Sequence, residues 1–320
     1  MTTFSDMLYQ LGGVPALAGI PFGPKSKYYF VDPTNGDDAN PGTDLAKPLA
    51  GLEAAYAKTV SGQHDCVFYI AGTTTTSFLA AMVWANSYTH LIGICAPSHV
   101  AQRARVNQES VVVSPLLTVS GSGCIFKNLY FFHGVNSASS LINVKVTGER
   151  NYFYNVHFAG GGHTTQAIDG GMSLQISGGS ENLFERCTIG VDTIAAATGM
   201  VGLSFAATGG AARNWFKDCH FSMYAGSATA LFVEVLGNSG IDRYQIFERC
   251  LFSNLSATAM TEAINVAAGF DANNKRLLLL NCALIGAADW DASNRGAIYL
   301  NNGTLTGGGN AGTMLVSNAT

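Results

Sequence analysis

A block of twelve residues with a fixed order of apolar and polar positions recurs from the middle of the chain onward. Two copies read TGERNYFYNVHF and GGSENLFERCTI, and successive copies end 27, 31, 32, 31 and 32 residues apart. Self-similarity at a period of roughly 20 to 50 residues is typical of solenoids. The six copies end at Phe131, Phe158, Ile189, Phe221, Phe252 and Leu284.

A short segment of apolar, polar, apolar order lies ahead of each block and predicts a strand with two inward side chains and one outward. The period holds several such strands and no helical pattern, which indicates coils stacked in parallel. We therefore predict an all-β fold, a right-handed parallel β-helix with a short N-terminal capping helix. The predicted segments are 117–119, 144–146, 174–176, 203–205, 233–235, 264–266 and 298–300.

Four columns of the aligned blocks predict buried stacks along the solenoid axis. The seventh and twelfth positions are almost always Phe or another large apolar residue. The tenth position holds Leu, Val or Cys, which predicts thiols that fill the core rather than a redox or metal site. The fifth position predicts an amide column that hydrogen-bonds from coil to coil. The thiols are Cys187, Cys219, Cys250 and Cys282, and the amides are Asn151, Asn182, Asn214 and Gln245.

The eighth and ninth positions carry charges whose sign alternates from coil to coil and within each pair. At a spacing of about 4.8 Å between coils, each charge would have opposite neighbours, which predicts a structural ion-pair lattice at a turn. Each exposed pair contributes only about 0 to 1 kcal/mol, but like charges would oppose a shifted register. The pairs are Glu185 with Arg186, Lys217 with Asp218, and Glu248 with Arg249.

Composition narrows the classes of function. Charged residues make up 12% of the chain, about half of the usual ~25%, and the net charge is −4 with no cluster of Lys or Arg. This balance argues against nucleic-acid binding. No apolar run reaches the ~18 residues of a membrane span, and the first Lys is Lys25, so we expect neither a membrane segment nor a secretion signal. The 7 Cys lack a CxxC pair, which favours reduced thiols.

Residues 28–56, YYFVDPTNGDDANPGTDLAKPLAGLEAAY, resemble the entry segment of the pectate-lyase-like parallel β-helix superfamily. The resemblance implies a strand at 28–31, a turn at 32–43 and a capping helix at 49–57. A cap would cover the open backbone edge of the first coil. Asp32, Asp37 and Asp38 could hold a cation in this turn, although local Asx turns explain them better.

Residues 4–23, FSDMLYQLGGVPALAGIPFG, lead directly into this segment and resemble β-helix proteins encoded beside the capsid genes of tailed bacteriophages. That resemblance implies a non-catalytic virion protein, such as a capsid decoration, head spike or fibre, made in the host cytoplasm. We expect a homo-oligomer, with a trimer favoured, whose partners are capsid or other virion proteins. No cofactor, metal or catalytic residue follows from it.

The alternative is a carbohydrate-active or glycan-binding β-helix, because the superfamily hosts lyases, hydrolases and adhesins. Acid/base chemistry needs two groups that flank one bond. The outward row of the predicted strands contains a single carboxylate, Glu234, and its only Lys is three coils away, about 14 Å. Asp289 and Asp291, beside Trp290, are weaker candidates that also fit a surface turn. The row is Thr118, Lys145, Gln175, Ser204, Glu234, Asn265 and Tyr299.

The remaining acids and the histidines add no clear site. Asp169 and Asp192 follow adjacent blocks at different distances, so they need not meet. His157 and His220 share the eleventh block position but lie two coils apart, about 10 Å, which is too far for one metal ion. Solvent-facing positions on the solenoid are the simpler interpretation of both.

The predicted domains are an apolar arm or cap at residues 1–27 and a single β-helix at 28–320. The arm has one charge before Phe22, Asp6, and a soluble chain does not usually expose such a segment. It either caps the first coil or packs between protomers or onto a capsid. The residues predicted to form this assembly surface are Phe4, Met7, Leu8, Tyr9, Leu11, Ile20 and Phe22.

Deletion of residues 1–19 distinguishes the two roles of the arm. Loss of a cap should unfold or aggregate the solenoid, since it would expose the first coil. Loss of a docking arm should leave a soluble β-helix that no longer assembles. Circular dichroism and mass by light scattering report both, and a variant that folds and assembles normally would contradict both roles.

Overall fold

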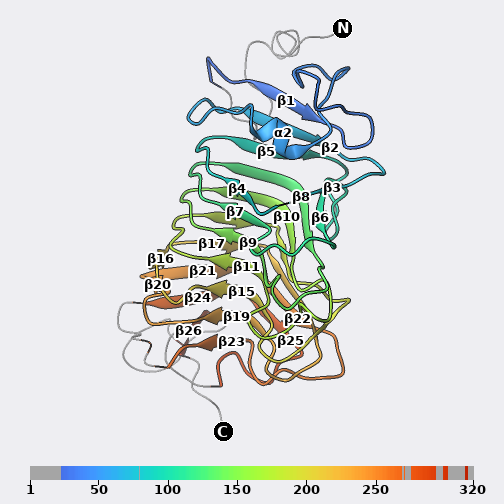
Figure 1. Ribbon diagram of the computed structural model, residues 1–320. Coiled ribbons are helices and arrows are strands. Elements are labelled where there is room, and N and C mark those ends of the chain that lie inside the picture. The colour runs from blue at the N-terminus through green and yellow to red at the C-terminus, as the bar shows by residue number, and fades with distance from the viewer. Residues whose placement is uncertain are drawn as a thin grey trace.

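The computed structural model of the protein describes residues 23–78, 80–268, 270, 275–292, 298–301 and 314–315. Within them the chain winds as the right-handed parallel β-helix that the repeat predicts (Figure 1). The coils follow one another from β1 to β26 along the axis, and each contributes strands to faces that we call A, B and C. Residues 1–22 of the arm predicted at 1–27 lie outside the described residues.

Faces A and B belong to one sheet, because β8 (Ile125–His133) and β10 (Tyr152–Ala159) run through the corner between them. Face A also contains β1 (Tyr28–Val31), β2 (Cys66–Ile70), β5 (His90–Ile94), β12 (Leu183–Glu185), β17 (Trp215–Lys217), β21 (Tyr244–Glu248), β24 (Arg276–Leu280) and β26 (Ile298–Asn301). Face B also contains β3 (Thr76–Ser77), β6 (Arg105–Gln108), β13 (Thr188–Ile189), β18 (His220–Ala225), β22 (Leu251–Asn254) and β25 (Ala283–Ile285).

Face C is a separate parallel sheet, and it contains the strands predicted ahead of each block. It is formed by β4 (Met82–Trp84), β7 (Leu117–Val119), β9 (Ile142–Val146), β11 (Met172–Ile176), β15 (Val201–Phe205), β19 (Leu231–Val235) and β23 (Ile264–Val266). Short pairings complete the sheets, and they involve β14 (Ala195–Ala196), β16 (Ala211–Ala212), β20 (Ile241–Asp242) and β27 (Met314–Leu315).

One predicted strand belongs to a different face. Residues 298–300 were expected on face C in line with Glu234, but Ile298 pairs with Leu277 and Tyr299 with Leu278 on face A. The assignment was wrong because it rested on the apolar, polar, apolar order alone, and that order also fits the first strand of a block. Tyr299 therefore does not belong to the outward row of face C.

The corner between faces A and B is a left-handed turn at the ninth position of the block. These residues have φ between 50° and 54°, a region that Asn and Asp adopt more readily than other residues with side chains. The tight turn directs the seventh and twelfth positions into the core from both faces. The corner residues are Asn128, Asn155, Arg186, Asp218, Arg249 and Asn281.

The predicted core stacks are confirmed. Phe153 and Phe184 stack with ring centroids 4.6 Å apart and planes 3° from parallel, and Phe221 stacks on Phe252 at 4.5 Å. The four thiols of the tenth position are buried, and each donates to a carbonyl of the preceding coil; Cys219, for example, donates to Phe184 O at 3.3 Å. Burial raises the pKa of Cys219, so this thiol is held protonated.

The fifth position forms the predicted amide ladder. Asn182 Nδ2 donates to Asn214 Oδ1 at 2.9 Å, and Asn214 Nδ2 donates to Gln245 Oε1 at 2.9 Å. Each amide also bonds the backbone, since Asn182 Oδ1 accepts from Asn151 N at 2.9 Å and Asn182 Nδ2 donates to Gly148 O at 3.1 Å. The ladder is fully buried and joins four successive coils.

The alternating charges form the predicted ion-pair lattice. Lys217 Nζ lies 3.0 Å from Glu185 Oε1, and the guanidinium of Arg249 binds both oxygens of Asp218 at 2.7 and 3.0 Å. Arg249 also pairs with Glu248 of its own coil. The lattice therefore extends both along and across the coils, with the exception of Arg186.

The N-terminal entry segment has the predicted parts. β1 is followed by Asx turns, in which Asp32 Oδ1 accepts from Thr34 N at 2.9 Å and Asp37 Oδ1 accepts from Ala39 N at 2.9 Å. Asp38 Oδ1 accepts from Ala50 N and Gly51 N at the start of helix α2 (Leu52–Tyr56), which is shorter than predicted. Asp32 and Asp37 thus form the predicted local Asx turns, whereas Asp38 binds the backbone that precedes α2, 12 and 13 residues further along the chain.

We expect Asn182→Ala to destabilise the protein by about 3 kcal/mol, because it leaves the buried Asn151 N–H and Gly148 C=O without partners. Asn35→Ala, which removes an exposed amide from the entry turn, is the control and should cost less than about 1 kcal/mol. Urea denaturation followed by circular dichroism measures both. Equal stability of the two variants would show that the ladder contributes little.

Candidate functional site

The outward side chains of face C form a polar row in exact register along the axis. Lys145 pairs with Gln175, Gln175 with Ser204, Ser204 with Glu234, and Glu234 with Asn265. The row is flanked by a small apolar cluster of Ile142, Met172, Val201 and Leu231, which are aligned in the same way. Met172, Val201 and Leu231 are buried, so this cluster packs from coil to coil beside the polar row.

A second carboxylate, which comes from a loop, lies near enough to Glu234 to affect its pKa. Burial raises the pKa of Glu234, and the negative charge of Asp169 raises it further. Asp169 is exposed and lies against the backbone of Gly199, where a Cβ would collide with its carboxylate. The loop before β11 therefore brings the exposed carboxylate of Asp169 toward the polar row, near a glutamate whose pKa is raised.

Ser204 lies between Gln175 and Glu234 in the row and is completely buried. Its Oγ has no hydrogen-bond partner among the described residues. Gln175 Nε2 has only a weak acceptor, Met172 Sδ, at 3.3 Å. Buried polar groups normally have partners, so Ser204 and Gln175 are under-satisfied, but Ser204 is inaccessible and Gln175 is only 8% exposed, which leaves Glu234 as the accessible polar group of this part of the row.

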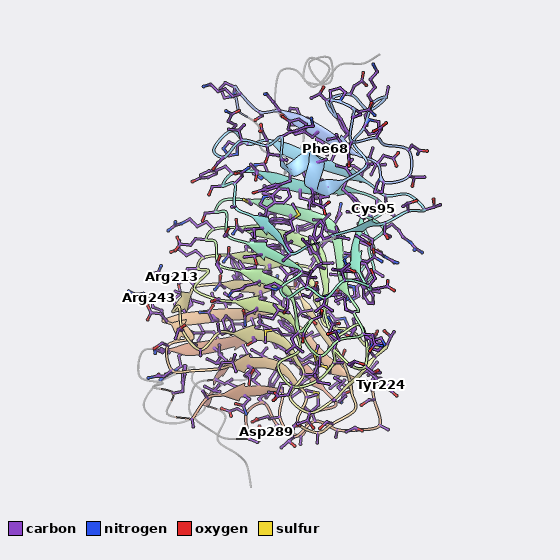
Figure 2. The ribbon with its side chains drawn as sticks, in the orientation of Figure 1. Phe68, Cys95, Arg213, Tyr224, Arg243 and Asp289 are labelled. Atoms are coloured by element: carbon purple, nitrogen blue, oxygen red, sulfur yellow. The ribbon has the colours of Figure 1, made fainter. Side chains whose placement is uncertain are left out.

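The structure keeps the weaker acidic candidates apart from this arrangement. Asp289 and Asp291 lie in a turn of the last described coils, where Asp291 N donates to Asp289 Oδ1 at 3.4 Å (Asp289 is labelled in Figure 2). Trp290 between them packs on Phe252 at 5.3 Å. The segment is a turn, but Asp291 is only 2% exposed, so the surface-turn interpretation is wrong for this residue. Glu262, another loop acid, accepts a hydrogen bond from Asn265 Nδ2 at 2.7 Å.

A second group of polar side chains lies on face B, where the histidines do not have the predicted surroundings. His157 is only 6% exposed, so the prediction that it faces solvent is wrong. The segment Cys95–Ala104, which we call the strap, covers it: Ala101 N donates to His157 Nδ1 at 3.0 Å. His157 Nε2 in turn donates to Gly190 O at 2.8 Å. Because Nδ1 accepts a hydrogen bond and Nε2 donates one, the ring is neutral.

The strap also brings a third histidine into contact with His220. His99 Nε2 lies 3.0 Å from His220 Nδ1 with the two rings stacked, and His220 Nε2 lies 2.6 Å from Ser253 Oγ. Burial, and secondarily His99, lower the pKa of His220. Sequence reasoning missed this cluster, because the strap lies outside the repeat and its residues have no equivalent in other coils.

A cleft of about 570 Å³ lies beside the strap, at the corner between faces A and B. We call it the corner cleft, and it is a surface that sequence reasoning also missed. Its lining comes from the strap, from β10 and from the ninth block position. The lining residues are Pro97, Ser98, His99, Tyr154, Asn155, Arg186 and Asp218.

Two classes of site find no counterpart in the part of the chain that the structure describes. No group of three His, Cys, Asp or Glu side chains is arranged to hold a metal ion among these residues. Within the same residues, no helix is long and apolar enough to cross a membrane. The predicted assembly residues between Phe4 and Phe22 lie outside the described residues, so their role stays a prediction.

The similarity to known proteins lies in the fold alone. No model of a known protein family matches the chain, and no curated protein matches its sequence significantly. Among solved structures, a rhamnogalacturonan lyase is 16% identical over 81% of this chain and 68% of its own, with a TM-score of 0.53. The pectin methylesterase of Aspergillus niger is 11% identical over 91% and 92%, with a TM-score of 0.54.

The pectin methylesterase of Erwinia chrysanthemi matches 82% of this chain and 80% of its own at 13% identity, with a TM-score of 0.53. The chain has the pectate-lyase-like parallel β-helix fold. This confirms the fold that the wider resemblance implied. The narrower resemblance to bacteriophage virion proteins finds no support in these comparisons.

Acid should destabilise the protein through His157. Burial lowers the pKa of His157 from 6.5 to about 4, so the unfolded chain takes up a proton below about pH 6.5 that the folded chain refuses until about pH 4. His157 should therefore add roughly 1.4 kcal/mol per pH unit to the fall in the free energy of unfolding across this window, beside the contributions of buried His90 and His133, whose pKa values are also lowered. Urea denaturation at a series of pH values measures the slope. A His157→Gln variant with the wild-type slope would exclude His157 as its source.

Proposed function

We propose that the protein is a carbohydrate-active β-helix that binds a polysaccharide on face C and hydrolyses a glycosidic bond there. The observation that carries the proposal is the pairing of Glu234, whose pKa is raised, with the exposed carboxylate of Asp169. A carboxyl group whose pKa is raised, with a second carboxylate near it, is an arrangement that suits acid/base hydrolysis. The named activities of the structural neighbours, on pectin and rhamnogalacturonan, support a polysaccharide as the class of ligand.

In this proposal Glu234 is the general acid and Asp169 the general base. Glu234 gives its proton to the leaving glycosidic oxygen, and Asp169 takes a proton from the attacking water, so that each product gains one new hydroxyl group. A lyase fits less well, because Lys145 is three coils above Glu234, about 14 Å away.

A role in a virion is compatible with this proposal, because a virion protein can carry a glycan site. It stays a prediction from the N-terminal segment. The described residues support a glycan site. If the protein bound glycans without turnover, its function would be that of an adhesin.

The test uses pectin, rhamnogalacturonan and bacterial surface polysaccharides, with products followed by reducing ends and by the absorbance of unsaturated sugars. We expect new reducing ends without unsaturated products. Glu234→Gln and Asp169→Asn should each lower the rate by about 100-fold or more, since each removes one proton-transfer group. The rate should also fall as the pH rises through the raised pKa of Glu234.

Glu248→Gln is the matched control, because Glu248 is a carboxylate of the ion-pair lattice on face A and should leave the rate unchanged. Absence of turnover on every polysaccharide, with binding retained, would replace the hydrolase by a glycan-binding protein. Turnover that survives Glu234→Gln would place the chemistry elsewhere.

A further inference from the structure

In the described part of the chain around the corner cleft, the negative side chains have ion-pair partners but two of the positive ones do not. The carboxylate that lines it, Asp218, has both oxygens engaged by Arg249, at 2.7 and 3.0 Å. The nearby carboxylate of Glu185 pairs with Lys217 at 3.0 Å and accepts a hydrogen bond from the Tyr152 hydroxyl at 2.8 Å. The negative charges around the cleft are therefore neutralised from the coils on either side.

Two cations beside the same cleft lack a direct ion pair among the described residues, although the charge of Arg186 acts on Asp218 of the following coil. Within the described residues, neither Arg186 nor Lys127 forms an ion pair. Arg186 is exposed and donates through Nη1 to the Tyr154 hydroxyl at 3.2 Å. Lys127 Nζ lies over the ring of Tyr154, 5.3 Å from its centroid. The half-buried Tyr154 thus has a cation on each side, and the cleft carries a local excess of positive charge.

Arg186 and Arg249 occupy the same position of the block, so their difference is informative. Arg249 grips the carboxylate of the preceding coil, Asp218, whereas the residue that precedes Arg186 in the same column is Asn155, which is neutral. The guanidinium fork of Arg186 therefore faces the cleft with most of its donors unused. Such a fork matches the two oxygens of a carboxylate.

We propose that the corner cleft binds a saccharide that carries a carboxylate group, with Arg186 as the carboxylate ligand. Lys127 adds long-range attraction, the ring of Tyr154 provides an apolar surface for the sugar, and Ser98 and His99 from the strap offer polar groups for its hydroxyls. The volume of about 570 Å³ lies within the roughly 300 to 1,000 Å³ of small-molecule sites. The site is separate from face C and does not depend on the hydrolase proposal.

Titration with methyl β-D-glucuronide and its neutral counterpart, methyl β-D-glucoside, tests the site, with binding followed by ligand-observed NMR or calorimetry. We expect the glucuronide to bind at least about tenfold more tightly than the glucoside, as one charge-assisted contact of ~1.4 kcal/mol or more implies. Arg186→Gln should abolish this difference. Arg186→Lys should retain only part of it, since the charge is kept and the fork is lost.

Arg213→Gln is the matched control, because Arg213 is a partly exposed arginine that pairs with Glu181 and lies on the far side of the solenoid from Cys95 in Figure 2. It should leave the affinity unchanged, and so should Glu234→Gln, which separates this site from the one on face C. Equal affinity for the two glycosides, or an unchanged affinity in Arg186→Gln, would overturn the proposal. So would sulfate that competes as tightly as the glucuronide, since the cleft would then be a general anion site.

Discussion

The buried amide ladder is the interaction on which the order of this solenoid depends. Each of Asn182 and Asn214 bonds both the next amide and the backbone of the preceding coil, so a slip of one residue would leave several buried polar groups unpaired. The aromatic stacks tolerate small shifts, because apolar contacts are not directional. Hydrogen bonds are directional, and the ladder therefore sets the register that aligns every other column, including the polar row of face C.

Much of the fold could be predicted because each coil must bury and pair the same kinds of side chain at the same positions. The stacked phenylalanines, the thiols, the amides and the alternating charges all occupy fixed positions of the twelve-residue block, so six copies reinforce one another. The strand at residues 298–300 was misplaced because the last coil lacks that full pattern and only a three-residue motif remained. The left-handed corner was also visible in principle, since three of its six residues are Asn.

The candidate sites were harder to predict, because both use residues that have no counterpart in neighbouring coils. Glu234 was recognised on its strand, but its partner Asp169 comes from a loop of irregular length. The strap is a single insertion, so nothing in the period indicated that His99 would reach His220. Arg186 was assigned to the lattice by its column, although the sequence already places a neutral residue, Asn155, at the same position of the preceding block; what only the structure shows is that Arg186 lines a cleft.

The strap affects how the solenoid unfolds. Coils of a solenoid normally touch only their immediate neighbours, so that unfolding can begin at an end and proceed one repeat at a time. The strap leaves face A after β5 and bonds Asn155 and His157 on β10, Thr188 on β13 and His220 on β18. It therefore couples coils that are not adjacent. The coils from β5 to β18 should open as one cooperative unit, while those that follow can fray independently.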